Sequence, residues 1–349
     1  MIAVQRANPF ACTWLIEKED RTPELVLTAN PTYWDHRRGP FVQKVVFRNS
    51  LSPDEALDLC ISGDGEVDIV TEVSPTDAQR VIDSKFAHLE VHDANRVLVG
   101  VFNRHVHRDV PLDDKHLRTA LNLCIDRAKI IRDGMLGYAT NIASLTPPWC
   151  AGHPKDLQPF ACDPAAAKAE FAHVSWPVGR PLRIATGGGF AGIANMVAND
   201  IRAALGIAVE VTVGEASGAL AGARALAEGK RVPEWDVLLN FWFDISSEAA
   251  PAMIHREFFG SDGAFRVGPD LPEFNRLYEE MAKETDAGHF VSKAEAIDRY
   301  SKEEALGLFL CSPKTLTAVN NHVKFEPYAT TFELAEATVL DGHWSLSDG

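Results

Sequence analysis

The stretch that decides the fold is LVGVFNRHVHRDVPLDDKHLRTALNLCIDRAKII at residues 98–131. It begins inside RVLVGVFN at 96–103, which is apolar at successive positions and so predicts a strand buried on both faces. From Asp113 onward, apolar residues recur at three- and four-residue spacing, which predicts a helix that ends near Gly134. A core strand followed by an amphipathic helix indicates an α/β protein.

Toward the N-terminus the pattern is that of strands with one helix. ELVLTAN at 24–30 and KVVFRNS at 44–50 alternate apolar and polar residues on either side of a turn-rich stretch, so they predict antiparallel strands. SPDEALDLCISG at 52–63 offers Ser52 as N-cap, Pro53 at the first helical position and Glu55 three residues after the cap. These are the signals of a capping box and a helix.

Toward the C-terminus the pattern alternates strand and helix. Asp163 followed by Pro164 marks the start of a further helix. PLRIAT at 181–186, a glycine loop, a helix closed by Gly206 and IAVEVTV at 207–213 together predict a βαβ unit with parallel strands. The remaining expected elements are a buried strand at 235–243, helices at 272–284 and 291–310, and closing strands from 315.

The amino-acid composition argues against nucleic acid and membranes as binding partners. The 349 residues include 49 acidic and 34 basic side chains, a formal charge of -15, which repels both nucleic-acid phosphates and anionic lipids. No apolar run reaches the roughly 18 residues that a membrane span needs, so we expect no direct membrane insertion. The start MIAVQRANPF lacks the pattern of a secretion signal, and the chain as written is expected in the cytoplasm.

Metal, cofactor and nucleophile signals are weak. The six cysteines form no Cys-x-x-Cys pair, and a disulfide between Cys150 and Cys162 is left open. His105 and His107 alternate as metal ligands can, but no third ligand accompanies them, so a solvated loop is preferred. No catalytic motif is present, and no cofactor is expected.

Four collinear blocks resemble the bacterial extracellular solute-binding proteins of family 5, the peptide- and nickel-binding components of ABC importers. The blocks are NPFACTWLIEKEDRTPELVLTANPTYWDHRRGPFVQKVVFR at 8–48, DEALDLCISGDGEVDIV at 54–70, the opening stretch at 98–131, and the run from DPAAAKAEFA to WDVLLNFWFD. The first keeps Asn30, Pro31, Tyr33 and Trp34; the third keeps Phe102, Asn103, Asp114, Arg118, Ala120, Leu121, Asp126 and Arg127. The second carries a two-residue insertion, and Arg6, Ala7 and Asn8 stand where the family has Gly-Thr-Gly.

The resemblance implies an α/β, two-lobed periplasmic-binding-protein-like fold (type II, cluster C-like) that is N-terminally truncated, because Met1 lies inside a family domain. Lobe I is expected at 1–112 plus 315–349, and the second α/β lobe at 113–314. The implied function is recognition of a peptide or other small-molecule ligand in an interlobe cleft, for delivery to an ABC permease. It implies a periplasmic or cell-surface location and no catalysis.

The resemblance also places the candidate ligand-binding residues. Trp242 and Phe243 correspond to an aromatic wall, and Asp244 to a carboxylate that meets a ligand's α-amino group, with Asn240 beside them. Further candidates are Asn103 at the end of the first core strand, and Arg266 with Arg256 as carboxylate partners. The opposing interpretation is that the aromatic pair belongs to the core.

Two other functions stay open. GGGFAG at 187–192 satisfies G-x-G-x-x-G between a strand and a helix, with Glu215 after the next strand, as in a nucleotide-dependent enzyme. The family blocks already account for this βαβ unit without a cofactor, so a flexible turn is preferred. The second alternative is a cytoplasmic ligand-sensing or interaction protein that uses the same module.

Overall fold

The computed structural model describes residues 14–19, 24–63, 67–104, 109–214, 234–243, 252–327 and 334–346. The chain forms two compact units: unit 1 is Met1–His92 with Thr315–Gly349, and unit 2 is Asp93–Lys314. The strand at 96–102 thus groups with unit 2, whereas the sequence prediction assigned residues up to 112 to the first lobe. None of the helices in the described ranges is both long and apolar enough to cross a bilayer.

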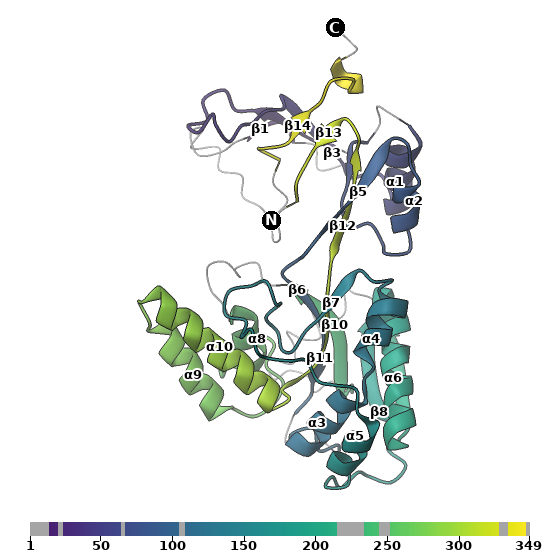
Figure 1. The fold of residues 1–349 in the computed structure, drawn as a ribbon, viewed down its shortest axis with the longest axis vertical. Coiled ribbons are helices and arrows are strands. Elements are labelled where there is room, and N and C mark those ends of the chain that lie inside the picture. Colours follow the sequence, from purple (N-terminus) through teal and green to yellow (C-terminus); the bar gives the residue numbers. More distant parts are fainter. Residues whose placement is uncertain are drawn as a thin grey trace. The chain divides into compact units, whose positions relative to one another are not determined.

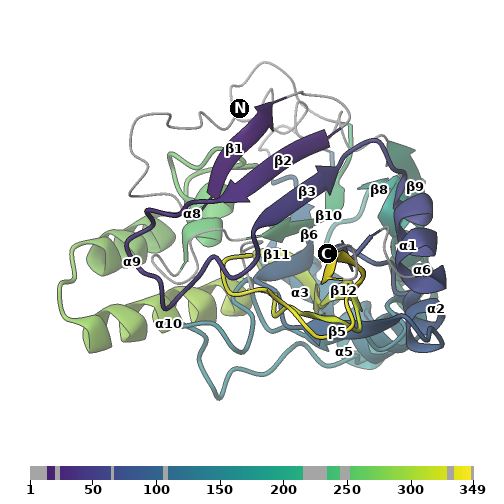
Figure 2. The same cartoon turned by 90° about the horizontal axis from the view of Figure 1, so that it is seen from above.

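Unit 1 is built mainly from small antiparallel sheets. Its elements are β1 (Trp14–Glu19), β2 (Glu24–Ala29), β3 (Lys44–Arg48), α1 (Pro53–Ser62), β4 (Ile69–Val70), α2 (Ala78–Ile82), β5 (Ala87–His92), β12 (Thr315–Asn320), β13 (Val323–Lys324), β14 (Thr338–Val339) and the 3-10 turn η3 (Trp344–Leu346). The sheets run in the orders β1-β2-β3, β4-β12-β5 and β13-β14. Figure 2 shows the first of these sheets, with β1, β2 and β3 side by side.

Unit 2 is a three-layer α/β arrangement. Its elements are β6 (Arg96–Phe102), α3 (Lys115–Cys124), α4 (Arg127–Lys129), the π-turn η1 (Ile130–Gly134), β7 (Ala139–Asn141), α5 (Pro164–Phe171), β8 (Leu182–Gly187), the 3-10 turn η2 (Gly188–Phe190), α6 (Ala191–Leu205), β9 (Val209–Gly214), β10 (Val237–Phe243), α8 (Met253–Phe259), α9 (Pro272–Ala282), α10 (Ala287–Glu303) and β11 (Gly307–Pro313). Six strands form one mixed sheet in the order β7-β11-β6-β10-β8-β9. The helices α3, α5 and α6 lie on one face of the sheet, and α8, α9 and α10 lie on the other (Figure 1).

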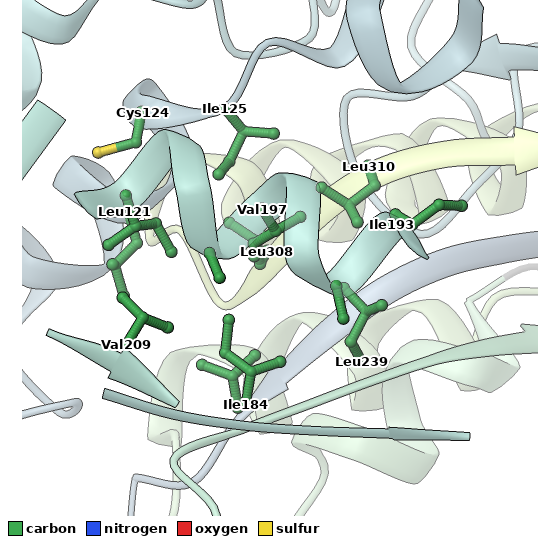
Figure 3. Packing of buried hydrophobic residues seen from close by; sticks show 14 of the residues in the cluster. Leu121, Cys124, Ile125, Ile184, Ile193, Val197, Val209, Leu239, Leu308 and Leu310 are labelled. Carbon is green, nitrogen blue, oxygen red and sulfur yellow. The ribbon is translucent and has the colours of Figure 1, made fainter. Parts of the chain in front are cut away.

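The strand β6 is the centre of unit 2. It pairs antiparallel with both β10 and β11, and all its residues after Arg96 are buried, as the sequence predicted. Leu98 and Phe102 pack with α3 and α6, whereas the alternate residues Val97, Val99 and Val101 pack with α8, α9 and α10. Figure 3 shows the first of these cores, where Leu308 and Leu310 of the neighbouring β11 gather with side chains of α3, α6, β8 and β10.

The predicted local signals form as expected. Ser52 and Glu55 close a capping box at the start of α1, and Asp163 caps α5. β2 and β3 pair antiparallel, and β8, α6 and β9 form the βαβ unit with parallel strands. α6 ends at Gly206, whose φ of 71° lies in the left-handed region that favours glycine.

The helix expected from Asp113 to Gly134 is instead interrupted. α3 ends at Cys124, Ile125 takes an extended conformation, and Asp126 accepts a hydrogen bond from the Lys129 backbone N–H as the cap of a new turn. The helical spacing of apolar residues continues across the break because Ile125 stays buried on the same side. Periodicity alone therefore does not reveal the break.

The buried Arg127 explains why the break is stable. Its guanidinium donates to the carbonyl oxygens of Phe309 (2.6 Å), Asn122 (2.9 Å) and Phe160 (3.3 Å) and to the side-chain oxygen of Asn122 (2.9 Å). Burial lowers the pKa of Arg127 to about 10, so the group stays charged at neutral pH. The charged guanidinium group thus links the turn after α3 to β11 and to the loop before α5 by hydrogen bonds.

We predict that Arg127→Ala lowers the free energy of unfolding by roughly 3 kcal/mol or more, because it leaves several buried carbonyl oxygens without a donor. Urea unfolding followed by circular dichroism measures this change. The matched control is Arg132→Ala, since Arg132 is exposed and pairs with the exposed-side neighbour Asp133; its cost is expected within about 0.5 kcal/mol. Equal costs for the two variants would contradict the role given to Arg127.

Candidate ligand pocket

A small pocket lies within unit 2 at the end of the sheet where β6 begins and β10 ends. It is lined by Asn95, Val97, Leu145, Thr146, Pro147, Cys150, Ala151, Trp242, Ala252 and Ile254. These residues come from β6 and the residue before it, the segment after β7, β10, and α8 with its N-cap. The cavity volume is about 20 Å³, which is room for one small chemical group rather than for a whole solute molecule.

Trp242 is the predicted site residue that reaches this pocket. Its ring packs edge-on against Phe258, with 4.7 Å between centroids, and is tilted against Phe265 at 5.0 Å, so it also closes the α8 side of the core. Its indole Nε1 is buried and has no hydrogen-bond partner among the described residues. The side chain is therefore both an aromatic wall and a donor without an acceptor, which is costly unless something supplies one.

The amide of Asn95 is held in place at the pocket. Its Oδ1 accepts from Trp149 Nε1 at 3.3 Å and from the Cys150 thiol at 3.0 Å. Cys150 is a free thiol, and so is Cys162, whose Sγ lies 3.8 Å from the carbonyl oxygen of Cys124. The disulfide that the sequence left open is thus not formed.

The other predicted site residues fall into two groups. Asn240 precedes Trp242 by two residues on β10, so both side chains lie on one face of the strand. Phe243 is the last residue of β10, and Asp244 lies outside the described residues. Asn103 follows the other end of β6, because the antiparallel register pairs Phe102 with Val237 but Val97 with Trp242.

Asn103 lies away from Trp242, whereas the segment that carries Arg266 reaches toward both, because the Phe265 ring lies 5.0 Å from that of Trp242. The backbone N–H of Arg104 donates to Val267 O at 3.0 Å, which joins the two segments. Asn103 is fully buried; its Nδ2 donates to Trp235 O at 3.1 Å, and its Oδ1 has no partner in the described part of the chain. Arg266 is paired with Asp270. The structure therefore does not bring all six predicted residues to one place, and their binding role stays a prediction.

Arg256 is not among the residues that line the pocket. Arg256 donates to Glu257 at 2.9 Å and to Asp262 at 2.5 Å. His105 and His107 lie outside the described residues. Across the described ranges, no group of three or more His, Cys, Asp or Glu side chains is arranged to hold a metal ion.

A Ser-His-Asp set that the sequence gave no signal for lies behind the pocket. His255 Nε2 is 2.8 Å from Asp298 Oδ1 and 3.3 Å from Ser144 Oγ, and all three residues are fully buried. A hydrolytic triad needs serine and aspartate on different ring nitrogens. Here both meet Nε2, while Nδ1 has no partner among the described residues, so the set is not a triad.

The glycine loop does not show the geometry of a nucleotide fingerprint. Gly187, Gly188, Gly189 and Gly192 have no positive φ, and a Cβ added at any of them would meet nothing within 4 Å. The fingerprint needs glycine for a tight turn and for close packing of helix on strand. Neither need exists here. Glu215, the expected acidic partner, lies outside the described residues.

Comparison with known proteins gives a family match over most of the chain. The family described as bacterial extracellular solute-binding proteins, family 5 Middle, matches residues 14–261. The dipeptide-binding protein of Escherichia coli (strain K12) is 29% identical over 138 residues, which are 39% of this chain and 24% of that protein.

Solved structures show the same two-lobed α/β fold. The ABC transporter substrate binding protein CtaP of Listeria monocytogenes superposes with a TM-score of 0.80 at 18% identity, over 94% of this chain and 66% of that one. The periplasmic binding protein DppA of Helicobacter pylori, in complex with the peptide STSA, gives 0.74 at 17% identity, over 94% of this chain and 62% of that one. This chain thus spans just under two thirds of the length of these structural relatives.

We predict that NAD and ATP do not bind, because the glycines at 187–192 meet none of the requirements of a phosphate-binding turn. Titration calorimetry with either nucleotide is expected to show no binding heat. Gly189→Ala is expected to leave stability unchanged. Gly100→Ala, the control, is expected to cost about 1–3 kcal/mol because its Cβ would lie 2.8 Å from Val237. Micromolar nucleotide binding that Gly189→Val abolishes would contradict this prediction.

Proposed function

The chain belongs to family 5 of the bacterial extracellular solute-binding proteins, and from this premise we propose that it binds a peptide or peptide-like solute for the permease of an ABC importer. The names of the dipeptide-binding relative and of the peptide complex support this ligand class. In this role the chain performs no chemical step. It works in the periplasm or at the cell surface, and its ligand lies in a cleft between the lobes.

The observation that carries the proposal is the buried indole N–H of Trp242, which has no hydrogen-bond partner in the described part of the chain. A peptide offers carbonyl and carboxylate oxygens, and an oxygen placed in the pocket would accept from Nε1. Because the donor is buried without a partner among the described residues, an oxygen of the ligand would offset the cost of its desolvation. Binding thus gains both a hydrogen bond and relief of that cost.

The small volume of the pocket limits which part of the ligand can bind in it. A volume of about 20 Å³ holds one small group, so the pocket anchors one end or one carbonyl of the solute, and the remainder lies outside it. Asn240, two residues before Trp242, adds a polar group on the same face of β10. We propose that Phe243 and Asp244 extend this surface, with Asp244 facing the α-amino group of a peptide.

We predict that Trp242→Phe weakens peptide binding about tenfold, because phenylalanine keeps most of the ring contacts but removes the N–H. A panel of dipeptides and tripeptides measured by titration calorimetry first identifies the tightest ligand, and the variant is then compared with the unchanged chain. The melting temperature is expected to fall only slightly.

The matched control is Trp176→Phe. Trp176 Nε1 donates to Arg180 O at 3.0 Å, so this variant removes a satisfied hydrogen bond at a site that does not line the pocket. Its peptide affinity is expected to equal that of the unchanged chain. If Trp242→Phe binds as tightly as this control, the pocket is not the ligand site; if no peptide binds the unchanged chain, the ligand class is wrong.

A further inference from the structure

Asp298 is a carboxylate buried in the middle of α10. Its exposed fraction is 0%, and within the described ranges its ion-pair partners are histidines rather than arginine or lysine. Oδ1 accepts from His255 Nε2 at 2.8 Å, and Oδ2 lies 3.6 Å from His153 Nδ1. The Ser144 hydroxyl lies 3.3 Å from the same His255 Nε2. Such burial is costly, so a role beyond filling space is expected.

The partners of Asp298 adjoin the pocket on two sides. Ser144 precedes the lining residue Leu145, and His153 Nδ1 lies 3.0 Å from the carbonyl oxygen of Thr146, another lining residue. Because a carbonyl oxygen only accepts, Nδ1 carries the proton. His255 follows the lining residue Ile254 at the start of α8. One carboxylate thus contacts both segments that form the pocket wall opposite β6 and β10.

We infer that Asp298 is a positioning residue for the ligand pocket: through His153 and His255 it fixes segment 144–153 and the start of α8, and so makes ligand affinity depend on pH. This inference rests on the proposed function, since it assigns the control of that same pocket. It adds a residue that touches no ligand and that comes from a different helix.

The charges around the carboxylate give the pH dependence its sign. Burial alone would raise the pKa of Asp298, but His153, His255 and Ser144 outweigh it and hold the pKa below 3.8. Interaction with Asp298 raises the pKa of His153 above 6.5 against the opposing effect of burial, with Glu295 adding a smaller contribution. Of the cations on α10, Arg299 is paired with Asp156, and Lys302 lies over the Phe160 ring.

The direction of the pH dependence follows from the linkage between proton binding and folding. The lowered pKa of Asp298 stabilises the folded cluster above pH 3.8, and this contribution is lost as pH falls through the folded pKa. The raised pKa of His153 stabilises it fully below pH 6.5, and this contribution is lost as pH rises through the folded pKa. The local stability of the pocket wall is therefore expected to be highest in mildly acid solution and to fall above neutral pH.

The experiment compares amide hydrogen exchange in segments 142–154 and 252–259 of the full chain at about pH 6 and about pH 8.5, corrected for intrinsic rates. In the unchanged protein, protection of both segments is expected to fall at the higher pH. In Asp298→Asn it is expected to be about tenfold lower at pH 6, a loss of roughly 1.4 kcal/mol, and to change little with pH. His153→Asn keeps a donor for Thr146 but cannot titrate, so its protection is expected to be independent of pH.

The control is Asp286→Asn, which removes a carboxylate from the same helix. Asp286 caps α10 by accepting from His289 N, and asparagine caps equally well, so this variant is expected to behave like the unchanged chain. If Asp298→Asn does not fold, His153→Asn decides the question. Persistence of the full pH dependence in His153→Asn, or unchanged protection in a folded Asp298→Asn, would overturn the inference.

A second measurement separates this inference from the proposed function. The dipeptide alanyl-phenylalanine is titrated into each variant at both pH values. Weaker binding at the higher pH in the unchanged chain, and not in His153→Asn, supports the inference. Binding that is equal at both pH values and in every variant overturns it. If the dipeptide binds none of the proteins, this test of the proposed function fails, and hydrogen exchange alone decides whether Asp298 positions the pocket wall.

Discussion

Unit 2 depends on the burial of β6 on both faces. The strand is hydrogen-bonded on each edge, to β10 and to β11, and both of its faces are covered by helices. Gly100 lies at its middle, where an added Cβ would meet Val237 at 2.8 Å and Leu308 at 3.0 Å. The neighbouring strands approach this closely only because the side chain is absent. The two ends of β6 are thereby fixed, with the pocket residues Asn95 and Val97 at its start.

Some buried polar groups in the described part of unit 2 are fully hydrogen-bonded, and others have atoms without a partner there. Arg118 donates to the carbonyl oxygens of Leu112, Asp113, Glu304 and Ala305. Arg127 likewise donates to backbone carbonyl oxygens, including that of Phe309. These guanidinium groups join loops to the sheet, and burial lowers the pKa of each to about 10 without discharging it. The Trp242 indole and Asp298 Oδ2, by contrast, are buried without hydrogen-bond partners in the described chain. Both lie at the pocket or directly behind its wall.

The sequence predicted those features whose cause is local. The capping box of Ser52 and Glu55, the cap at Asp163 and the parallel βαβ unit each depend on residues within one or two elements, and all three form. The break after α3 was missed because Ile125 keeps the helical spacing of buried side chains while Asp126 starts a new turn. The cluster of Ser144, His255 and Asp298 was missed for a different reason. Its members are separated by 111 and 43 residues, so no local pattern could join them.

The motif residues that carry the family resemblance are scaffold residues. In the stretch at 98–131, Phe102 is core, Asp114 caps α3, Asp126 caps the next turn, and Arg118 and Arg127 bind carbonyl oxygens. None of these side chains lines the pocket. A match to this motif therefore specifies the sheet and its helices but leaves the ligand open, because one scaffold can present different loops. Under the function proposed above, ligand choice falls to residues at the end of β10 and in segment 144–153, and contacts from residues far away in sequence, such as Asp298, would position them.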